Sequence, residues 1–336
     1  METTSPVADC TAGHNHTLQI SVLISAHNPD ETRLRAVLLA LREQTLPTSE
    51  WETILVNNAS TRWPDERVLT EYAPRNLSII QEPVLGLSAA RRRGFMSAHD
   101  DIAVLVDDDN ILAPNYLVEA LAIFAKHPRI GLAGGKSLPS FSCEPPSWSH
   151  EFFPLLALRD LGDNELMSDG LQPKGATENQ YPSFAPIGAG MVLRRAAWTA
   201  WLQAAGMNSA LSDRRGDELS SAGDNEIVLC AMQAGWEVGY FPQLRLTHLI
   251  PSQRLQAEYL ARLNRSIQRS WIQVLALHDA CPWPPLTRTG AALRKFKALL
   301  TQRPWTSDAA HVRWQGACGH FDGRATPLSR RPTLSN

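Results

Sequence analysis

The sequence predicts an α/β protein with a Rossmann-like, mostly parallel central sheet that is flanked by helices and followed by a helical C-terminal extension. Short apolar segments alternate with segments of helical periodicity over residues 18–135, a pattern typical of successive βαβ units. Polar residues follow several of these apolar segments directly, and open α/β sheets bind ligands beyond the carboxyl ends of their strands. The sequence therefore predicts a binding site at that edge.

The expected strands are short runs of β-branched and aliphatic residues that end at polar or turn residues. They cover 18–25, 51–56, 77–81, 102–106 and 130–134. The expected helices between them carry apolar residues three and four positions apart and cover 32–44, 88–99 and 114–127. An irregular stretch rich in Pro, Ser and Gly follows over 138–182. A further helix is expected at 224–234, and strands at 236–241 and 244–248.

The composition excludes several classes of protein. Hydrophobic residues make up 43% and charged residues 20% of the 336, as in soluble folded proteins. The net charge of -2 gives no global attraction to nucleic acid, so no nucleic-acid partner is expected. No run approaches the ~20 apolar residues that span a membrane, and residues 1–17 lack a secretory-signal pattern. Five scattered Cys without CxxC spacing indicate reduced thiols, so we expect a cytoplasmic protein.

An acidic triplet follows the apolar strand 102–106. Asp107, Asp108 and Asp109 lie next to one another, and like charges this close raise each other's pKa unless a cation neutralises them. Mg²⁺ or Mn²⁺ suits such a cluster because it takes carboxylate oxygens and leaves positions for phosphate. In strand geometry Asp107 and Asp109 would point to one face and Asp108 to the other. A solvated acidic turn is the alternative.

Three further features are each compatible with a structural role. The segment 86–94 enters a helix with Arg91 near its start, a place that favours phosphate but also suits a basic helix face. Asp224 opens the helix 224–234, as an N-cap or as a catalytic carboxylate. His248 ends a strand, as a structural residue or as a ligand. Gly188 and Gly190 fit either a close backbone approach to a ligand or a tight bulge.

In this order the segments 22–28, 54–61, 86–94, 105–110 and 222–226, with His248 behind them, resemble the glycosyltransferase family 2 proteins of the GT-A fold. The likeness spans 18–251. It implies a metal-dependent, inverting transfer of a sugar from a nucleotide diphosphate-sugar to a glycan, a lipid-linked or another hydroxyl acceptor. It also implies a catalytic domain over 18–251, between an N-terminal tail over 1–17 and an extension over 252–336. Within that domain, 18–135 would be the nucleotide-binding half and 136–251 the acceptor-binding half.

The resemblance carries roles over to individual positions. Asp224 takes the place of the general base, and Mn²⁺ or Mg²⁺ is expected on Asp107, Asp109 and His248. Nucleotide-binding roles fall on Asn28, Asn57, Asn58, Arg91, Asp107 and Asp108. The family often has Asp where this chain has Asn57, and an amide still pairs with a pyrimidine base, so UDP- or dTDP-sugars are favoured over GDP-sugars.

The remaining segments give weaker predictions. Residues 138–182 are expected to form an acceptor lid whose aromatic side chains Trp148, Phe152 and Phe153 stack on sugars. Apolar residues at helical spacing after residue 252 predict a helix packed on the domain, with peripheral contact to the inner face of a membrane as the alternative. A sugar-nucleotide pyrophosphorylase and a dehydrogenase are disfavoured because no Gly-rich loop follows the first strand, and a sugar-nucleotide-binding protein without transferase activity stays open.

Overall fold

The computed structural model describes residues 19–168, 181–204 and 223–326. The predicted tail over 1–17 lies outside the described residues. So do residues 169–180 of the predicted lid and residues 205–222 of the predicted acceptor-binding half.

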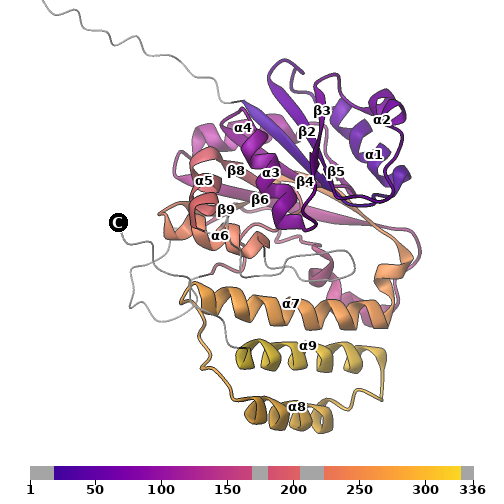
Figure 1. Ribbon diagram of the computed structural model, residues 1–336, viewed down its shortest axis with the longest axis vertical. Helices are drawn as coiled ribbons and strands as arrows, with labels where there is room; N and C mark the ends of the chain where they lie inside the picture. Colours follow the sequence, from indigo (N-terminus) through magenta and orange to yellow (C-terminus); the bar gives the residue numbers. More distant parts are fainter. Residues whose placement is uncertain (1–18, 169–180, 205–222, 327–336) are drawn as a thin grey trace, which may run out of the picture.

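Within the described residues, one sheet of nine strands forms the centre of the molecule, in the order β3-β2-β1-β4-β8-β6-β9-β5, with β7 paired to β9 (Figure 1). The pairings give six of the nine strands one direction, with β5, β7 and β8 opposed, so the sheet is mixed and mostly parallel as predicted. The strands are β1 (Ile20–Ala26), β2 (Trp51–Asn58), β3 (Leu77–Glu82), β4 (Ile102–Asp107), β5 (Asn110–Leu112), β6 (Ile130–Phe141), β7 (Leu166–Met167), β8 (Val192–Arg194) and β9 (Glu237–Ile250).

Helices cover both faces of the sheet, which explains why β1 is mostly apolar, with only Ser21 and Ser25 as polar residues. Ile20, Val22 and Ile24 of β1 pack with α1 and α4, whereas Leu23 packs with α3, α5 and α6 on the other face. This alternation follows the two-residue period of a strand. The helices are α1 (Glu31–Arg42), α2 (Glu66–Tyr72), α3 (Leu87–Ser97), α4 (Tyr116–Lys126), α5 (Arg195–Ala204) and α6 (Gly223–Gln233).

The register of the strands brings the polar strand ends to one edge. Ser25 of β1 pairs with Asp107 of β4, and Ala26 pairs with Asn57 of β2. The antiparallel pairing of β5 with β9 places His248 beside Asn110, directly after the acidic triplet. Paired residues as far apart in the chain as Asn110 and His248 therefore meet at the edge where the sequence predicted a site.

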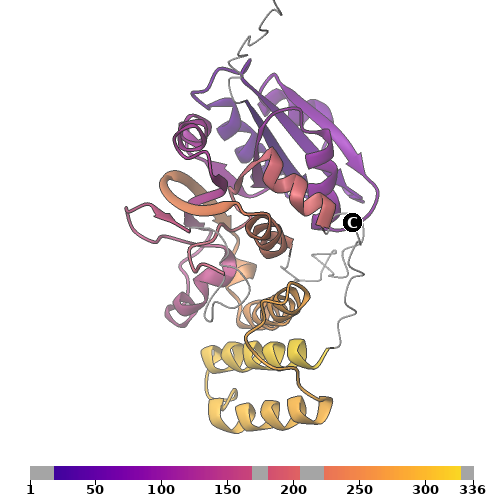
Figure 2. The same ribbon diagram turned by 90° about the vertical axis from the view of Figure 1, so that its left-hand side faces the viewer.

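The C-terminal extension forms a helical layer below the sheet (Figures 1 and 2). It consists of the 3₁₀ helix η2 (Ser252–Leu255) and the helices α7 (Ala257–Leu277), α8 (Arg288–Gln302) and α9 (Asp308–Ala325), and both views place α9 between α7 and α8. Leu260 and Leu263 of α7 pack with Val312 of α9 and with Phe152 of the 3₁₀ helix η1 (Ser147–Leu156), which confirms the predicted packed helix. No helix in the described part of the chain has the length and apolarity to cross a bilayer.

Two predictions about the second half of the domain are wrong. The strands expected at 236–241 and 244–248 form one strand, β9, whose pairing with β6 shifts register between Gly134 and Lys136. Pro242 lies inside β9. A Pro usually indicates the end of a strand, but a strand can continue past it where there is a bulge. The start of the expected irregular segment, residues 138–141, is the end of β6.

Candidate active site

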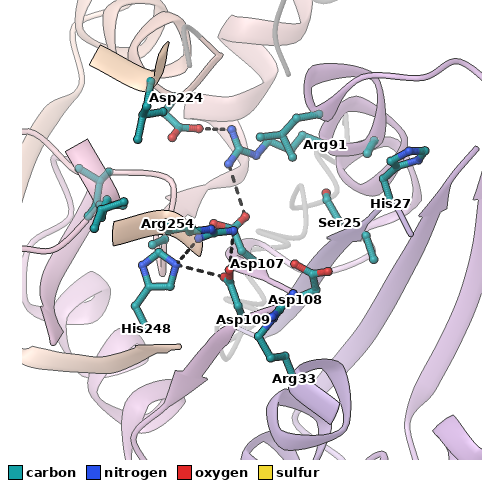
Figure 3. A pocket seen from close by; sticks show the side chains of 18 of the residues that line it. Ser25, His27, Arg33, Arg91, Asp107, Asp108, Asp109, Asp224, His248 and Arg254 are labelled. Atoms are coloured by element: carbon teal, nitrogen blue, oxygen red, sulfur yellow. Dashed lines mark hydrogen bonds and ion pairs between the residues drawn. The ribbon is translucent and has the colours of Figure 1, made fainter. Parts of the chain in front are cut away.

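A cavity of about 510 Å³ lies at the carboxyl ends of β1 and β4, closed from below by α7. Eight of the nine residues to which the sequence assigned a role line it, and Asn57 is the exception. The eight are Asn28, Asn58, Arg91, Asp107, Asp108, Asp109, Asp224 and His248. The tertiary structure therefore gathers side chains from β1, β2, α3, β4, α6 and β9 around one space (Figure 3).

Arg91 connects the two carboxylates that the sequence assigned to different roles. Its Nη1 pairs with Asp224 Oδ1, and its Nη2 lies 3.9 Å from Asp107 Oδ1 (Figure 3). The guanidinium is 3% exposed because α3 packs on β1 and β2 at this point. Gly188 donates its backbone N–H to Asp224 Oδ2 at 3.0 Å. Asp224 is thus held across the cavity from the acidic triplet, with one arginine between them.

Asp109 is paired with a residue of the C-terminal extension. Arg254 Nη2 lies 3.0 Å from Asp109 Oδ2, and His248 Nε2 lies 3.3 Å from Asp109 Oδ1 (Figure 3). Arg254 Nη1 also lies 3.2 Å from His248 Nε2, so the three side chains form one cluster. The Asp109 carboxylate is 4% exposed, and a buried carboxylate needs such a counter-charge.

Asp107 and Asp109 do not share a face in the way that strand geometry predicted. β4 ends at Asp107, and the chain turns over Asp108 and Asp109 before β5 begins at Asn110. Asp107 therefore faces Arg91 while Asp109 faces Arg254. The prediction assumed an extended chain through the triplet, and the turn removes that condition.

Asp108, in the middle of the triplet, has a carboxyl group with a raised pKa. Burial is the largest cause of the rise, the negative charges of Asp109 and Asp107 add to it, and Arg254 and Arg33 oppose it; together they place the pKa at about 7. A divalent cation bound beside this group would favour its ionised form and release the proton to solvent.

Asn28, Asn57 and Asn58 hold the loops that follow β1, β2 and β3. Asn28 Oδ1 accepts from Thr61 N at 2.9 Å and from Arg62 N at 2.8 Å. Asn57 Oδ1 accepts from Ser60 N at 3.2 Å. These amide oxygens act on backbone N–H groups, and the nucleotide contact assigned to them stays a prediction.

Asn58 joins β2 to the loop before α3. Its Nδ2 donates to Val84 O at 2.7 Å and to Glu82 O at 3.3 Å, and its Oδ1 accepts from Gly86 N at 2.8 Å. Three hydrogen bonds from one buried side chain therefore fix the loop that leads to Arg91. The contact to a base predicted for Asn58 is likewise untested.

The residues present match a divalent cation in chemistry but do not assemble a full set of ligands. Asp109 and His248 are in contact, and His248 Nδ1 is buried without a hydrogen-bond partner. Arg254 contacts both Asp109 and His248, so its guanidinium occupies oxygen and nitrogen atoms that a cation would need. Among the described residues, no group of three or more His, Cys, Asp and Glu side chains is arranged to hold a metal ion. Asp109 and His248 are the pair that would hold one, in competition with Arg254.

Sequence reasoning missed several residues of the cavity. Arg254 follows His248 by six residues, and only its place after the end of β9 could have drawn attention to it. Arg33 on α1 and the apolar side chains Tyr259, Leu263 and Ile267 of α7 also line the space. The apolar stripe of α7 was expected from its spacing, and it faces this cavity.

The predicted lid contributes to the cavity in a different way from the one expected. Residues 154–157, at the end of η1, line it. The aromatic side chains Trp148, Phe152 and Phe153 do not; they pack in the hydrophobic cluster formed with α7 and α9. Phe152 is buried in that cluster and is not placed to stack on a sugar, whereas Trp148 and Phe153 are half-buried, and sugar stacking by these two stays a prediction.

Comparison with known proteins identifies the chain. Residues 21–198 match the model of glycosyl transferase family 2. The chain is 30% identical over 112 residues to an uncharacterized protein (y4gI) of Sinorhizobium fredii, 28% over 143 residues to the O-antigen biosynthesis protein RfbC of Myxococcus xanthus, and 30% over 105 residues to the putative colanic acid biosynthesis glycosyl transferase WcaA of Escherichia coli.

These matches cover 32%, 39% and 31% of this chain and 12%, 11% and 37% of those relatives. Among solved structures, S. aureus TarS is similar with a TM-score of 0.49 at 15% identity, over 90% of this chain and 54% of TarS. The family model covers more than half of the chain, and the sheet with its flanking helices is the predicted GT-A architecture. The chain belongs to glycosyltransferase family 2.

Proposed function

We propose that this protein is an inverting glycosyltransferase that moves a sugar from a nucleotide diphosphate-sugar to a hydroxyl acceptor. The observation that carries the proposal is the placement of Asp224 and the acidic triplet on opposite sides of one cavity, joined by Arg91. Family membership supports the reaction class. The acceptor oxygen would form a bond to the anomeric carbon while the bond from that carbon to the diphosphate oxygen breaks, and the nucleoside diphosphate would leave.

The charges around the cavity support a donor that arrives with a cation. Five Asp side chains and three Arg side chains line it, so carboxylates exceed guanidinium groups by two. A diphosphate would add to this negative excess, and a divalent cation would offset it. We propose Mn²⁺ or Mg²⁺ on Asp109 and His248, with Asp107 as the third predicted ligand. When bound, the ion would stabilise the charge that develops on the leaving diphosphate.

The side chains of this protein have separate tasks in the proposed reaction. Arg91 would donate to the diphosphate from the floor of the cavity, and its burial favours a strong charge-assisted hydrogen bond. Asp224 would take the proton of the acceptor hydroxyl, with Gly188 N–H holding one of its oxygens in place. One carboxylate acting from the face opposite the leaving group implies inversion of configuration.

Three finer points belong to the same proposal. A UDP- or dTDP-sugar is the proposed donor on the sequence resemblance alone, because Asn57 does not line the cavity and its Oδ1 accepts from Ser60 N. A glycan or lipid-linked acceptor is proposed because two relatives are named for O-antigen and colanic acid biosynthesis. A cytoplasmic location is proposed because the five Cys are scattered along the sequence without CxxC spacing, as expected for reduced thiols.

The test compares two carboxylate-to-amide variants. Asp224→Asn is expected to keep nucleotide binding and to lose about 10²–10⁴-fold in turnover, the usual contribution of a general base. Asp163→Asn makes the same change at an 86% exposed carboxylate outside the cavity and is expected to leave turnover unchanged. Release of nucleoside diphosphate from a panel of nucleotide-sugars measures turnover, and calorimetry with Mn²⁺ measures binding. Equal turnover in the two variants would refute the role of Asp224.

The alternative of a binding protein without transferase activity has its own outcome in this test. Donor binding without release of nucleoside diphosphate, in the wild-type protein with every acceptor of a glycan panel, would favour it. The structure does not support the pyrophosphorylase alternative. That class needs a Gly-rich loop after the first strand, whereas the loop after β1 is anchored by Asn28 and contains no glycine.

A further inference from the structure

The helix α8 has an unusual outer surface. Ala291 and Ala298 are buried, and Lys295 pairs with Asp322 of α9 at 2.7 Å, so this side of α8 faces α9. Seven residues separate the two alanines, which places them on the same side of the helix. The opposite side carries Leu293, Phe296 and Leu300, at positions that share a face.

These three side chains are large, apolar and exposed to solvent. Leu293 is 71%, Phe296 is 60% and Leu300 is 54% exposed, and Trp305, three residues after the helix, is 66% exposed. Single exposed apolar residues are ordinary, whereas a row of them along one helix marks a binding surface. Both views place α8 as the outermost element of the molecule, with α9 between it and α7 (Figures 1 and 2). Nothing in the described part of the chain packs on this row.

Exposed cations flank the apolar row. Arg288, Arg294, Lys297 and Arg303 are all exposed, and no Asp or Glu occurs in α8. The whole chain has a net charge of -2, so this basic surface is local. A helix with an apolar face and flanking Lys and Arg is the type that lies in the interface of a membrane with anionic lipids.

From these observations we propose that the outer face of α8, formed by Leu293, Phe296 and Leu300 with the cations around them, docks on an anionic membrane surface. Anionic lipid is favoured over a second copy of the chain as the occupant. A two-fold contact through this face would bring the same exposed cations towards one another. The surface differs from the stripe of α7, which faces the cavity, and it is independent of the proposed reaction because no residue of α8 lines the cavity.

The experiment is co-sedimentation of the full chain with vesicles. We expect binding to vesicles of equal parts phosphatidylglycerol and phosphatidylcholine, and none to phosphatidylcholine alone, with binding lost as salt screens the charges. The variant Leu293→Ser/Phe296→Ser/Leu300→Ser and the variant Arg294→Glu/Lys297→Glu should each weaken binding by at least about tenfold. Met96→Ser/Val118→Ser is the matched control, since it removes exposed apolar side chains from α3 and α4, and it should bind as the wild type does.

Two readouts separate this proposal from folding and from the proposed function. Circular dichroism melting should be nearly the same in all variants, because the substituted side chains are exposed. Release of nucleoside diphosphate in the absence of vesicles should also be unchanged. Vesicle binding that survives in both α8 variants would overturn the proposal, as would no binding of the wild type to anionic vesicles. So would a dimer in light scattering that the triple Ser variant abolishes, because the face would then be a self-association surface.

Discussion

Gly188 offers the sharpest test of how the site is held, because its lack of a side chain allows Asp224 and Arg91 to approach. A Cβ at this position would lie 2.6 Å from Arg91 Nη2 and closer still to Asp224 Oδ2. Both are the ends of flexible side chains, so Gly188→Ala would displace them rather than the backbone. To reach ordinary van der Waals contact they must move by about 1 Å, and a shift of that size costs on the order of 10²-fold in rate.

We therefore expect Gly188→Ala to reduce kcat about 100-fold, equivalent to about 2.7 kcal/mol of transition-state stabilisation. Its free energy of unfolding should change by less than about 1 kcal/mol, since the displaced groups can relax into the cavity. Gly94→Ala is the matched control, because its Cβ meets only Leu23, at 3.4 Å, and an Ala in α3 favours the helix. Nucleoside diphosphate release and urea unfolding measure the two quantities. Wild-type kcat in Gly188→Ala would show that the position of Asp224 does not limit the reaction.

Three further predictions concern the cation site and the donor loop. Arg254→Met should bind Mn²⁺ alone at least about tenfold more tightly, a gain of about 1.4 kcal/mol, because the guanidinium that competes for Asp109 is removed. Calorimetry measures the affinity, and equal affinity in the variant and the wild type would contradict the competition. Asp109→Ala should lose Mn²⁺-dependent nucleotide binding, and retention of that binding would remove Asp109 from the ligands. Asn58→Ala should lower the free energy of unfolding by about 2–3 kcal/mol, because three hydrogen bonds to the loop 82–86 are lost. Asn57→Ala loses one side-chain hydrogen bond, from Ser60 N, and should cost about 1 kcal/mol. A reversed order in urea unfolding would contradict the anchor role of Asn58.

Much of the fold was predictable because its signals are local. The strand predicted at 18–25 is mostly apolar because β1, which begins at Ile20, is covered on both faces, and the 3.6-residue period of 32–44 appears in α1. The short strands β5 and β8 were missed, because three residues carry too little pattern to separate a strand from a loop. Pro242 gave a false break because the pairing partner β6 accommodates the bulge, and no local signal announces a partner that lies a hundred residues away.

The sequence by itself determined which residue types are available for the chemistry, namely the carboxylates 107–109, Arg91, Asp224 and His248, and the strand ends or helix starts on which they lie. Only the tertiary structure decided which charge meets which. Arg91 bridges Asp107 and Asp224, and Arg254 reaches Asp109 from an extension that the sequence described only as a packed helix. The physical reason is that ion pairs between distant segments depend on strand register and helix packing. Both are set by the burial of the whole apolar core, and the spacing of the charged residues in the sequence does not indicate them.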